Sequence, residues 1–333
     1  MSYESENTLP KETRLETVCE FLQLLGYERF KGRHPFRRPN VIDFGWFSAS
    51  HYESNVGVEL HLRKAETGEL VVDTRTPAAR SYHDLLQQNR TIREIKRRFG
   101  GTFETDEGKN RCWSTKGMSP PVPAARGARR AYSRLRYSLF QIAVYRQSIS
   151  IAPERKKISG IEWMDSLNPS VLSNNLLLPF LTAALEDFFK SSFVALLRYS
   201  DRKETFFKNA RLNASHLTGI SNGTLTVEEA IAQALPFQKI SSICDHFRAF
   251  DPALDLAGCL KRPYRRRSSS LFESLEKMVE KRHELIHRNT LASDYSDELA
   301  EHDINNVKVA TTRCIQRMNS HYEWNLSRFD LDL

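Results

Sequence analysis

The change in hydrophobic period near residue 117 constrains the fold of this chain more than any other feature. Before it, apolar residues alternate with polar ones in short runs such as Val56-Gly-Val-Glu-Leu-His-Leu, which is the period of a β-strand. After it, apolar residues recur every three to four positions over long stretches, as in amphipathic helices. The junction, Gly117-Met-Ser-Pro-Pro-Val-Pro, can neither continue a helix nor complete a β-ladder. We therefore predict two structural classes in one chain, divided at this junction.

Residues 1–117 are predicted to form a small α+β domain. Strands are expected over 41–44, 56–62 and 70–73, with Glu66-Thr-Gly-Glu supplying a hairpin turn between the last two. Helical spacing predicts helices over 11–26 and 82–99, and Gly100-Gly101 provides the end of the second. The same glycine pair would also let backbone amides approach a phosphate, but a helix end followed by a turn is the more common use.

The remainder of the chain is predicted to be all α-helical. We assign residues 118–164 to a basic helical linker and 165–330 to a helical bundle domain. No internal repeat indicates a solenoid. Six stretches carry helical periodicity: 125–148, 172–199, 227–234, 240–250, 271–288 and 304–326.

Charge and composition favour a polyanionic partner. The 333-residue chain has a net charge of +8 and a sequence pI near 9.2, and residues 126–157 alone carry about +8. Its five cysteines are scattered and form no Cys-x-x-Cys pair, so neither a disulfide framework nor a cysteine zinc site is indicated. No run approaches the roughly 18 apolar residues of a membrane helix, and the first residues are acidic. We expect a cytoplasmic protein with no membrane association.

The densest group of reactive side chains is Lys281-Arg-His-Glu-Leu-Ile-His-Arg288. Arg282 falls on the apolar stripe formed by Leu271, Leu275, Met278 and Leu285. A buried guanidinium needs an acidic partner or an anion such as phosphate. His283 and His287 are four residues apart and share an adjacent face of the same helix.

These residue types are sufficient for cleaving RNA through its own 2′-hydroxyl, without a metal or other cofactor. Histidine titrates near neutrality, so His287 would move protons to or from the reacting oxygens. Arg282 would stabilise the charge that develops on the phosphorus centre. The structural alternative is that Arg282 pairs with Glu186 or Asp187 inside the bundle, while His287 caps a helix end.

The same letters also satisfy a zinc-hydrolase pattern. His283-Glu-Leu-Ile-His287 matches His-Glu-x-x-His, in which two histidines bind zinc and the glutamate acts as a base. Against this alternative, Lys281 and Arg282 place two positive charges beside the first ligand. A third ligand would have to come from Glu298, Glu301 or His302, and their spacing matches neither of the usual extensions.

Arg282-His-Glu-Leu-Ile-His287 resembles the Arg-x4-His motif of the HEPN superfamily, an all-helical group rich in metal-independent ribonucleases, and Arg288-Asn289 continues the resemblance. Leu181-Thr-Ala-Ala-Leu-Glu-Asp-Phe-Phe189 is similar to an earlier helix of those proteins that supplies an acidic residue. The resemblance implies that Glu186 positions Arg282 and that His283 supports the site. It also implies a homodimer that cleaves single-stranded RNA to a 2′,3′-cyclic phosphate.

Two broader expectations come from the same resemblance. Family members commonly act as toxins or anti-phage effectors, which leaves open a regulatory partner for this chain. Residues 1–117 are similar, on fewer grounds, to the small modules that precede HEPN and Toprim effectors, which implies a sensing or targeting role. A non-catalytic RNA-binding module remains the alternative from a different functional class.

Two basic segments are candidates for RNA contact. The 125–148 helix interleaves arginines with apolar residues, and its Arg130 and Arg134 would contact phosphates while Tyr132 and Tyr137 stack on bases. The alternative is a helix that packs one face on the bundle and solvates the other. The second segment precedes the motif helix, and its candidate residues are Lys261, Arg262, Arg265, Arg266 and Arg267.

Overall fold

The computed structural model describes residues 2–30, 40–116, 120–150, 168–264, 269–288, 290–324 and 326. The chain divides into two compact units, Met1–Pro120 and Pro121–Leu333. The first combines a sheet with helices, and the second contains helices and no strand among its described residues, which confirms the predicted order of an α+β part followed by an all-α part. No helix among the described residues has the length and apolar character needed to span a membrane.

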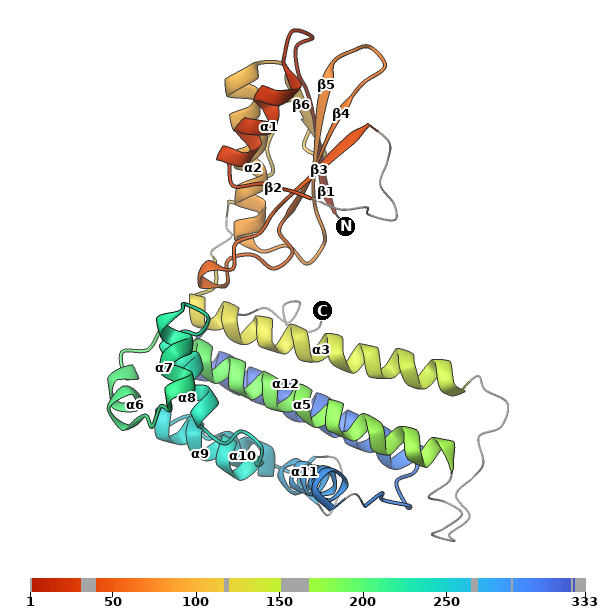
Figure 1. The fold of residues 1–333 in the computed structure, drawn as a ribbon, viewed down its shortest axis with the longest axis vertical. Helices are drawn as coiled ribbons and strands as arrows, with labels where there is room; N and C mark the ends of the chain where they lie inside the picture. The colour runs from red at the N-terminus through yellow and green to blue at the C-terminus, as the bar shows by residue number, and fades with distance from the viewer. Residues whose placement is uncertain are drawn as a thin grey trace. The chain divides into compact units, whose positions relative to one another are not determined.

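The first unit is built on a six-stranded antiparallel sheet with the order β2-β3-β4-β5-β1-β6 (Figure 1). The predicted strands are confirmed as β3, β4 and β5, and the predicted turn joins the last two, where Ala65 N donates to Glu69 O at 2.8 Å. Strands β1, β2 and β6 were not predicted. The strand bounds are β1 Tyr3–Thr8, β2 Glu28–Arg29, β3 Val41–Trp46, β4 Val58–Lys64, β5 Leu70–Thr76 and β6 Thr102–Thr105.

Helices α1 (Leu15–Leu24) and α2 (Tyr82–Phe99) pack on the same face of this sheet (Figure 1). Alternate residues of β4 point toward them, so that Val58, Leu60 and Leu62 join the buried core. Ser81 begins α2 through a capping box with Asp84. A short 3-10 helix, Ser50–Tyr52, follows β3.

Gly100-Gly101 ends α2 in a turn, as predicted, and the chain then enters β6. Gly100 has φ +80 and Gly101 has φ +78, backbone conformations that residues with a Cβ rarely adopt. A Cβ on Gly101 would overlap the carbonyl oxygen of Thr8 in β1. The pair is therefore explained by the turn and by its close approach to a neighbouring strand.

We expect Gly101→Ala to destabilise this unit by about 2 kcal/mol or more, because backbone strain and a backbone overlap combine. Gly68→Ala is the matched control, since Gly68 has a similar φ of +89 but open space around its Cβ; the substitution should cost about 1 kcal/mol from strain alone. Hydrogen-exchange protection of the β1 and β6 amides measures both effects. Equal losses in the two variants would show that the contact with Thr8 is unimportant.

Three long helices form the frame of the second unit (Figure 1). They are α3 (Pro123–Ser150), α5 (Pro169–Arg198) and α12 (Asp297–His321), and α5 packs along α3. The core is rich in aromatic side chains, with Phe193 in edge contact with Phe237 and Phe247. The remaining helices are α6 (Lys203–Asn209), α7 (Ala214–Ser221), α8 (Val227–Ala234), α9 (Ile240–Phe250), α10 (Leu256–Lys261) and α11 (Leu271–Arg288).

The bounds predicted for α8, α9 and α11 are confirmed, whereas α12 begins earlier than the predicted residue 304. Ser296 accounts for the earlier start, because its side chain caps the helix by accepting from Leu299 N. The residues assigned to a linker, 118–164, include α3, which packs against α5 within the second unit. Helices α6, α7 and α10 were not predicted.

Candidate functional site

The motif lies on α11, which is fixed at its start by a reciprocal cap. Glu273 N donates to Ser270 Oγ at 3.2 Å, and Ser270 N donates to Glu273 Oε2 at 2.9 Å. Burial of Leu271, Leu275 and Met278 then orients the helix against the core. This stripe is the one predicted from the sequence.

Arg282 continues the buried stripe one turn beyond Met278. Its Nε is shielded from solvent and has no hydrogen-bond partner. Within the described part of the chain, Arg282 forms neither a hydrogen bond nor an ion pair. Since a buried cationic donor without a partner costs free energy, Arg282 is a side chain suited to receiving an anion.

Glu186 on α5 is the acidic group that acts on Arg282. It is half-buried, and burial raises its pKa above the usual value, while the positive charges of Arg282 and Lys190 oppose that shift. Asp187 is exposed instead and accepts hydrogen bonds from Arg134 Nε and Nη2, with Nη2 to Oδ2 at 3.1 Å. The two adjacent carboxylates thus have different surroundings, and the charge of Arg282 affects that of Glu186.

The two histidines of the motif lie against each other on the exposed side of α11. The ring centroids of His283 and His287 are 4.4 Å apart, with an interplanar angle of 45°. Both side chains are solvent-exposed, so a substrate can reach either ring. Glu284, which the zinc pattern assigns as the base, forms an i,i+4 ion pair with Arg288, with Oε1 3.6 Å from Nη1.

The segment that follows α11 is held by two asparagines of α5. Ala292 N donates to Asn175 Oδ1 at 3.0 Å, and Asn175 Nδ2 donates to Ala292 O at 3.0 Å. Asn174 Nδ2 donates to Tyr295 O at 3.3 Å. These bonds connect the segment that follows the motif helix to α5.

Lys281 contacts Tyr295, which belongs to the segment that follows α11. Its ammonium lies 4.8 Å from the ring centroid of Tyr295, whose hydroxyl donates to Asp303 Oδ2 at 2.9 Å. Burial raises the pKa of Asp303, against the effects of Tyr295, Lys281 and His302. Lys281 therefore faces the inner side of the bundle, and Arg282, His283 and His287 remain as the reactive set.

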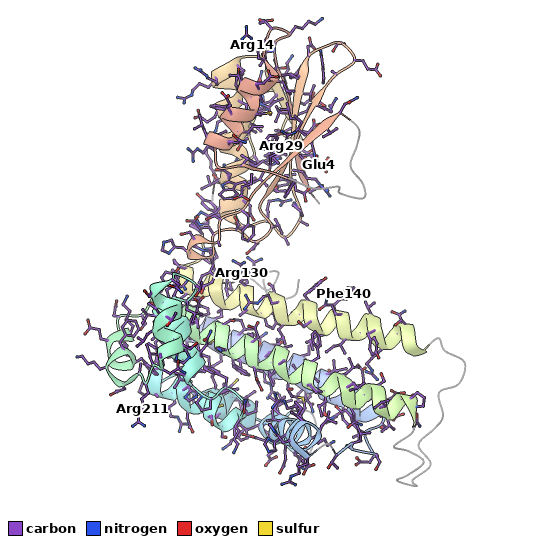
Figure 2. All side chains as sticks on the ribbon, viewed as in Figure 1. Glu4, Arg14, Arg29, Arg130, Phe140 and Arg211 are labelled. Atoms are coloured by element: carbon purple, nitrogen blue, oxygen red, sulfur yellow. The ribbon has the colours of Figure 1, made fainter. Side chains whose placement is uncertain are left out.

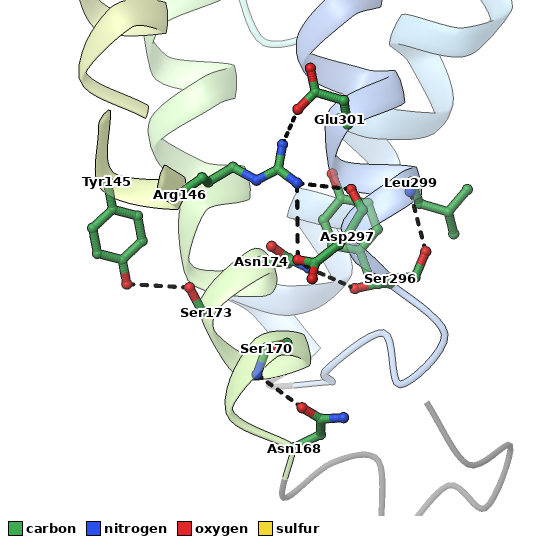
Figure 3. A network of polar contacts seen from close by, with 11 residues as sticks. Tyr145, Arg146, Asn168, Ser170, Ser173, Asn174, Ser296, Asp297, Leu299 and Glu301 are labelled. Carbon is green, nitrogen blue, oxygen red and sulfur yellow. Dashed lines mark hydrogen bonds and ion pairs between the residues drawn. The ribbon is translucent and has the colours of Figure 1, made fainter. Parts of the chain in front are cut away.

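Figure 3 shows the polar network that holds the start of α12. Arg146 of α3 binds Glu301 and donates to Asp297 O at 2.9 Å, while Tyr145 and Ser173 join α3 to α5 with their oxygens 3.2 Å apart. His302 is 3.6 Å from Asp303. Two of the candidate third zinc ligands, Glu301 and His302, thus have other partners.

No group of three histidine, cysteine or acidic side chains in the described ranges lies in an arrangement that could hold a metal ion. The histidine pair of α11 therefore has no third ligand among these residues. Zinc binding by this chain would require a ligand from elsewhere or a rearrangement of α12.

The predicted RNA-contact residues have different surroundings. Arg134 is bound to Asp187 and Ser191, and the Lys261 ammonium lies 4.9 Å from the Phe272 ring centroid. Arg130 is partly buried, and the carbonyl of Arg262 accepts from Arg313. Arg265, Arg266 and Arg267 lie outside the described residues.

Sequence reasoning missed two features of the second unit. Asn174 and Asn175 are buried amides on α5, and buried amides signal a specific hydrogen-bonding role. The exposure of Phe140 was not predicted: it lies on the outer side of α3 (Figure 2), whereas Tyr137, the predicted stacking residue, is exposed as that prediction requires. Tyr132, by contrast, is buried and bonded to Thr312, which removes it from the candidate stacking residues.

Comparisons with known proteins give no match: neither a protein-family model, nor a curated protein, nor a solved structure is similar to this chain. The functional conclusion therefore depends on the residues and their geometry.

Proposed function

We propose that this protein is a metal-independent endoribonuclease of the HEPN type, with its site on α11. One observation carries the proposal: Arg282 of α11 is partly buried, its Nε has no hydrogen-bond partner, and the same helix exposes two contacting imidazoles. The charge of Arg282 also affects Glu186 of α5. A cation that binds phosphate and a group that moves protons are the two requirements of this chemistry. Glu186 acts as the positioning residue for Arg282.

In the proposed reaction, the 2′-hydroxyl oxygen attacks the adjacent phosphorus and gives its proton to one imidazole. The bond from phosphorus to the 5′-oxygen breaks, and an imidazolium supplies the proton that this oxygen takes up. His287 carries a proton-transfer step, with His283 as the supporting group. Arg282 binds the nonbridging phosphate oxygens as negative charge develops on them. The products are a 2′,3′-cyclic phosphate and a 5′-hydroxyl.

Incubating the full chain with single-stranded RNA, with and without EDTA, separates this proposal from its alternatives. Cleavage that survives chelation supports it. Cleavage that is lost on chelation and restored by zinc would indicate the His283-Glu-x-x-His287 hydrolase, whereas binding without cleavage would indicate a non-catalytic RNA-binding module.

We further propose that the active form is a homodimer in which two α11 helices meet. Ile286 supports this proposal, because it is a large apolar side chain that is 46% exposed. It lies in the motif between His283 and His287, where a second protomer would cover it. Other exposed apolar residues in the unit include Tyr137, Phe140, Leu172, Leu176 and Phe180.

We expect Ile286→Asp to convert the dimer to a monomer and to lower cleavage in parallel, because the new carboxylate would be buried between protomers. Sedimentation velocity at micromolar concentration measures the first effect. Leu217→Asp on α7 is the control, since Leu217 is 56% exposed and distant in sequence from the motif. A wild-type monomer that cleaves RNA would contradict the dimer.

The proposed biological role is that of a toxin or anti-phage effector in the cytoplasm, controlled by a ligand or a regulatory partner. It follows from the resemblance of the motif and from the presence of a separate first unit.

A further inference from the structure

An open cavity of about 1000 Å³ lies in the first unit, at one end of its sheet. It is bounded by the start of β3, the end of β4, the start of β5 and the connection between β1 and α1. This volume is in the range of pockets that hold small-molecule ligands. No residue of the proposed ribonuclease site belongs to it.

The described lining of the cavity contains three cations, Lys11, Arg63 and Lys64, and no carboxylate. Arg63 is fixed by Glu6 and by Asp73, each at 2.8 Å. Lys11 and Lys64 are exposed, and within the described residues no ion pair or hydrogen bond engages their ammonium groups. Two free positive charges at the rim of one cavity favour an anionic ligand.

The rest of the lining fits a ligand with both apolar and polar parts. Leu15, Val41 and Ile42 are lining residues that are not fully buried, and they supply an aliphatic surface, while Thr13 and Asn40 supply a hydroxyl and an amide. An aliphatic chain alone would leave the hydroxyl and the amide without hydrogen-bond partners. Inorganic phosphate would leave the apolar surface uncovered. A phosphorylated nucleoside meets both requirements.

The outer face of the same sheet is acidic, which disfavours a long polyanion as the ligand. Residues paired across the strands place carboxylates in two neighbouring rows on the face opposite α1 and α2, and Glu4 of this face is labelled in Figure 2. Arg63 and Arg75 pair with some of these carboxylates, but acidic side chains outnumber these two arginines on the face. RNA running along it would therefore meet net like charge. The acidic residues of the two rows are Glu4, Glu6, Glu28, Asp43, Glu59, Asp73 and Glu104.

We propose that this cavity binds a nucleotide, with its phosphates at Lys11 and Lys64 and its base on the aliphatic surface. The site is independent of the ribonuclease proposal and gives the first unit a small-molecule ligand of its own.

Isothermal titration of the full chain with ATP tests the proposal, with adenosine, pyrophosphate and laurate as companion probes. ATP should bind, and adenosine and pyrophosphate should each bind about tenfold more weakly or worse, because each satisfies only part of the cavity. The double variant Lys11→Glu/Lys64→Glu should weaken ATP binding by about tenfold or more. Lys109→Glu/Lys116→Glu, which makes the same charge change in the same unit outside the cavity, should leave the affinity unchanged.

Melting curves verify that both double variants remain folded. No ATP binding at concentrations up to about 5 mM would overturn the proposal, and so would ATP binding that is equal in the wild type and Lys11→Glu/Lys64→Glu. Laurate binding in the absence of ATP binding would also overturn it, since the cavity would then hold an acyl chain.

Discussion

His287→Ala is expected to lower the rate of RNA cleavage by about 100-fold to 10,000-fold, the usual contribution of a group that transfers protons in the transition state. His287 is exposed at the end of α11 and is not part of the buried stripe, so the variant should keep its melting temperature. Single-turnover cleavage of a labelled RNA in EDTA measures the rate.

Two comparisons sharpen this result. His283→Ala should cause a smaller loss, because the ring of His287 remains although its neighbour at 4.4 Å is gone. His246→Ala on α9, where the imidazole contacts Pro236 O at 2.9 Å, should not affect cleavage. If His283→Ala is instead the inactive variant and His287→Ala retains activity, the roles of the two histidines are reversed from those proposed here.

Arg282→Met is expected to lower cleavage by about 100-fold to 1000-fold, as with the removal of one group that stabilises transition-state charge. Its effect on stability should be in the opposite direction. Arg282 carries a shielded Nε without a partner, so methionine of similar length removes an unfavourable buried donor. The melting temperature should be unchanged or higher.

Arg288→Met is the matched control on the same helix. Arg288 is exposed, and its Nη1 lies 3.6 Å from Glu284 Oε1 in an i,i+4 pair, so neither cleavage nor melting should change much, as for most surface ion pairs. A strongly destabilised Arg282→Met variant would contradict the proposed role, because it would make Arg282 a structural residue of the α5–α11 contact.

Much of the fold was predictable because local signals and tertiary packing agree. Helices α2, α9 and α11 have strong apolar periods, and their predicted bounds match. Strand β1 has the polar sequence Tyr-Glu-Ser-Glu-Asn-Thr and gave no strand signal. It forms because β5 and β6 pair with it on either side, information that lies far away in the sequence.

The parts of the candidate site that depend on one helix could be predicted from the sequence. The parts that depend on contacts between helices could not. Helical spacing placed Arg282 on the inward stripe, and its Nε is shielded from solvent. The role of Glu186 as its positioning residue stays a prediction. The hydrogen bonds between Asn175 and Ala292 join residues that are 117 positions apart in the sequence, so no local pattern could predict them. The contact between His283 and His287 follows from i,i+4 geometry, but its exposure depends on how α11 packs.

The most direct test of the account uses a DNA strand that contains a single ribonucleotide. The wild-type chain in EDTA should cut only at the phosphate 3′ to that ribonucleotide and leave a 2′,3′-cyclic phosphate, while Arg282→Met and His287→Ala should leave the strand intact. Cleavage at positions that lack a 2′-hydroxyl, or cleavage that requires added zinc, would contradict the account.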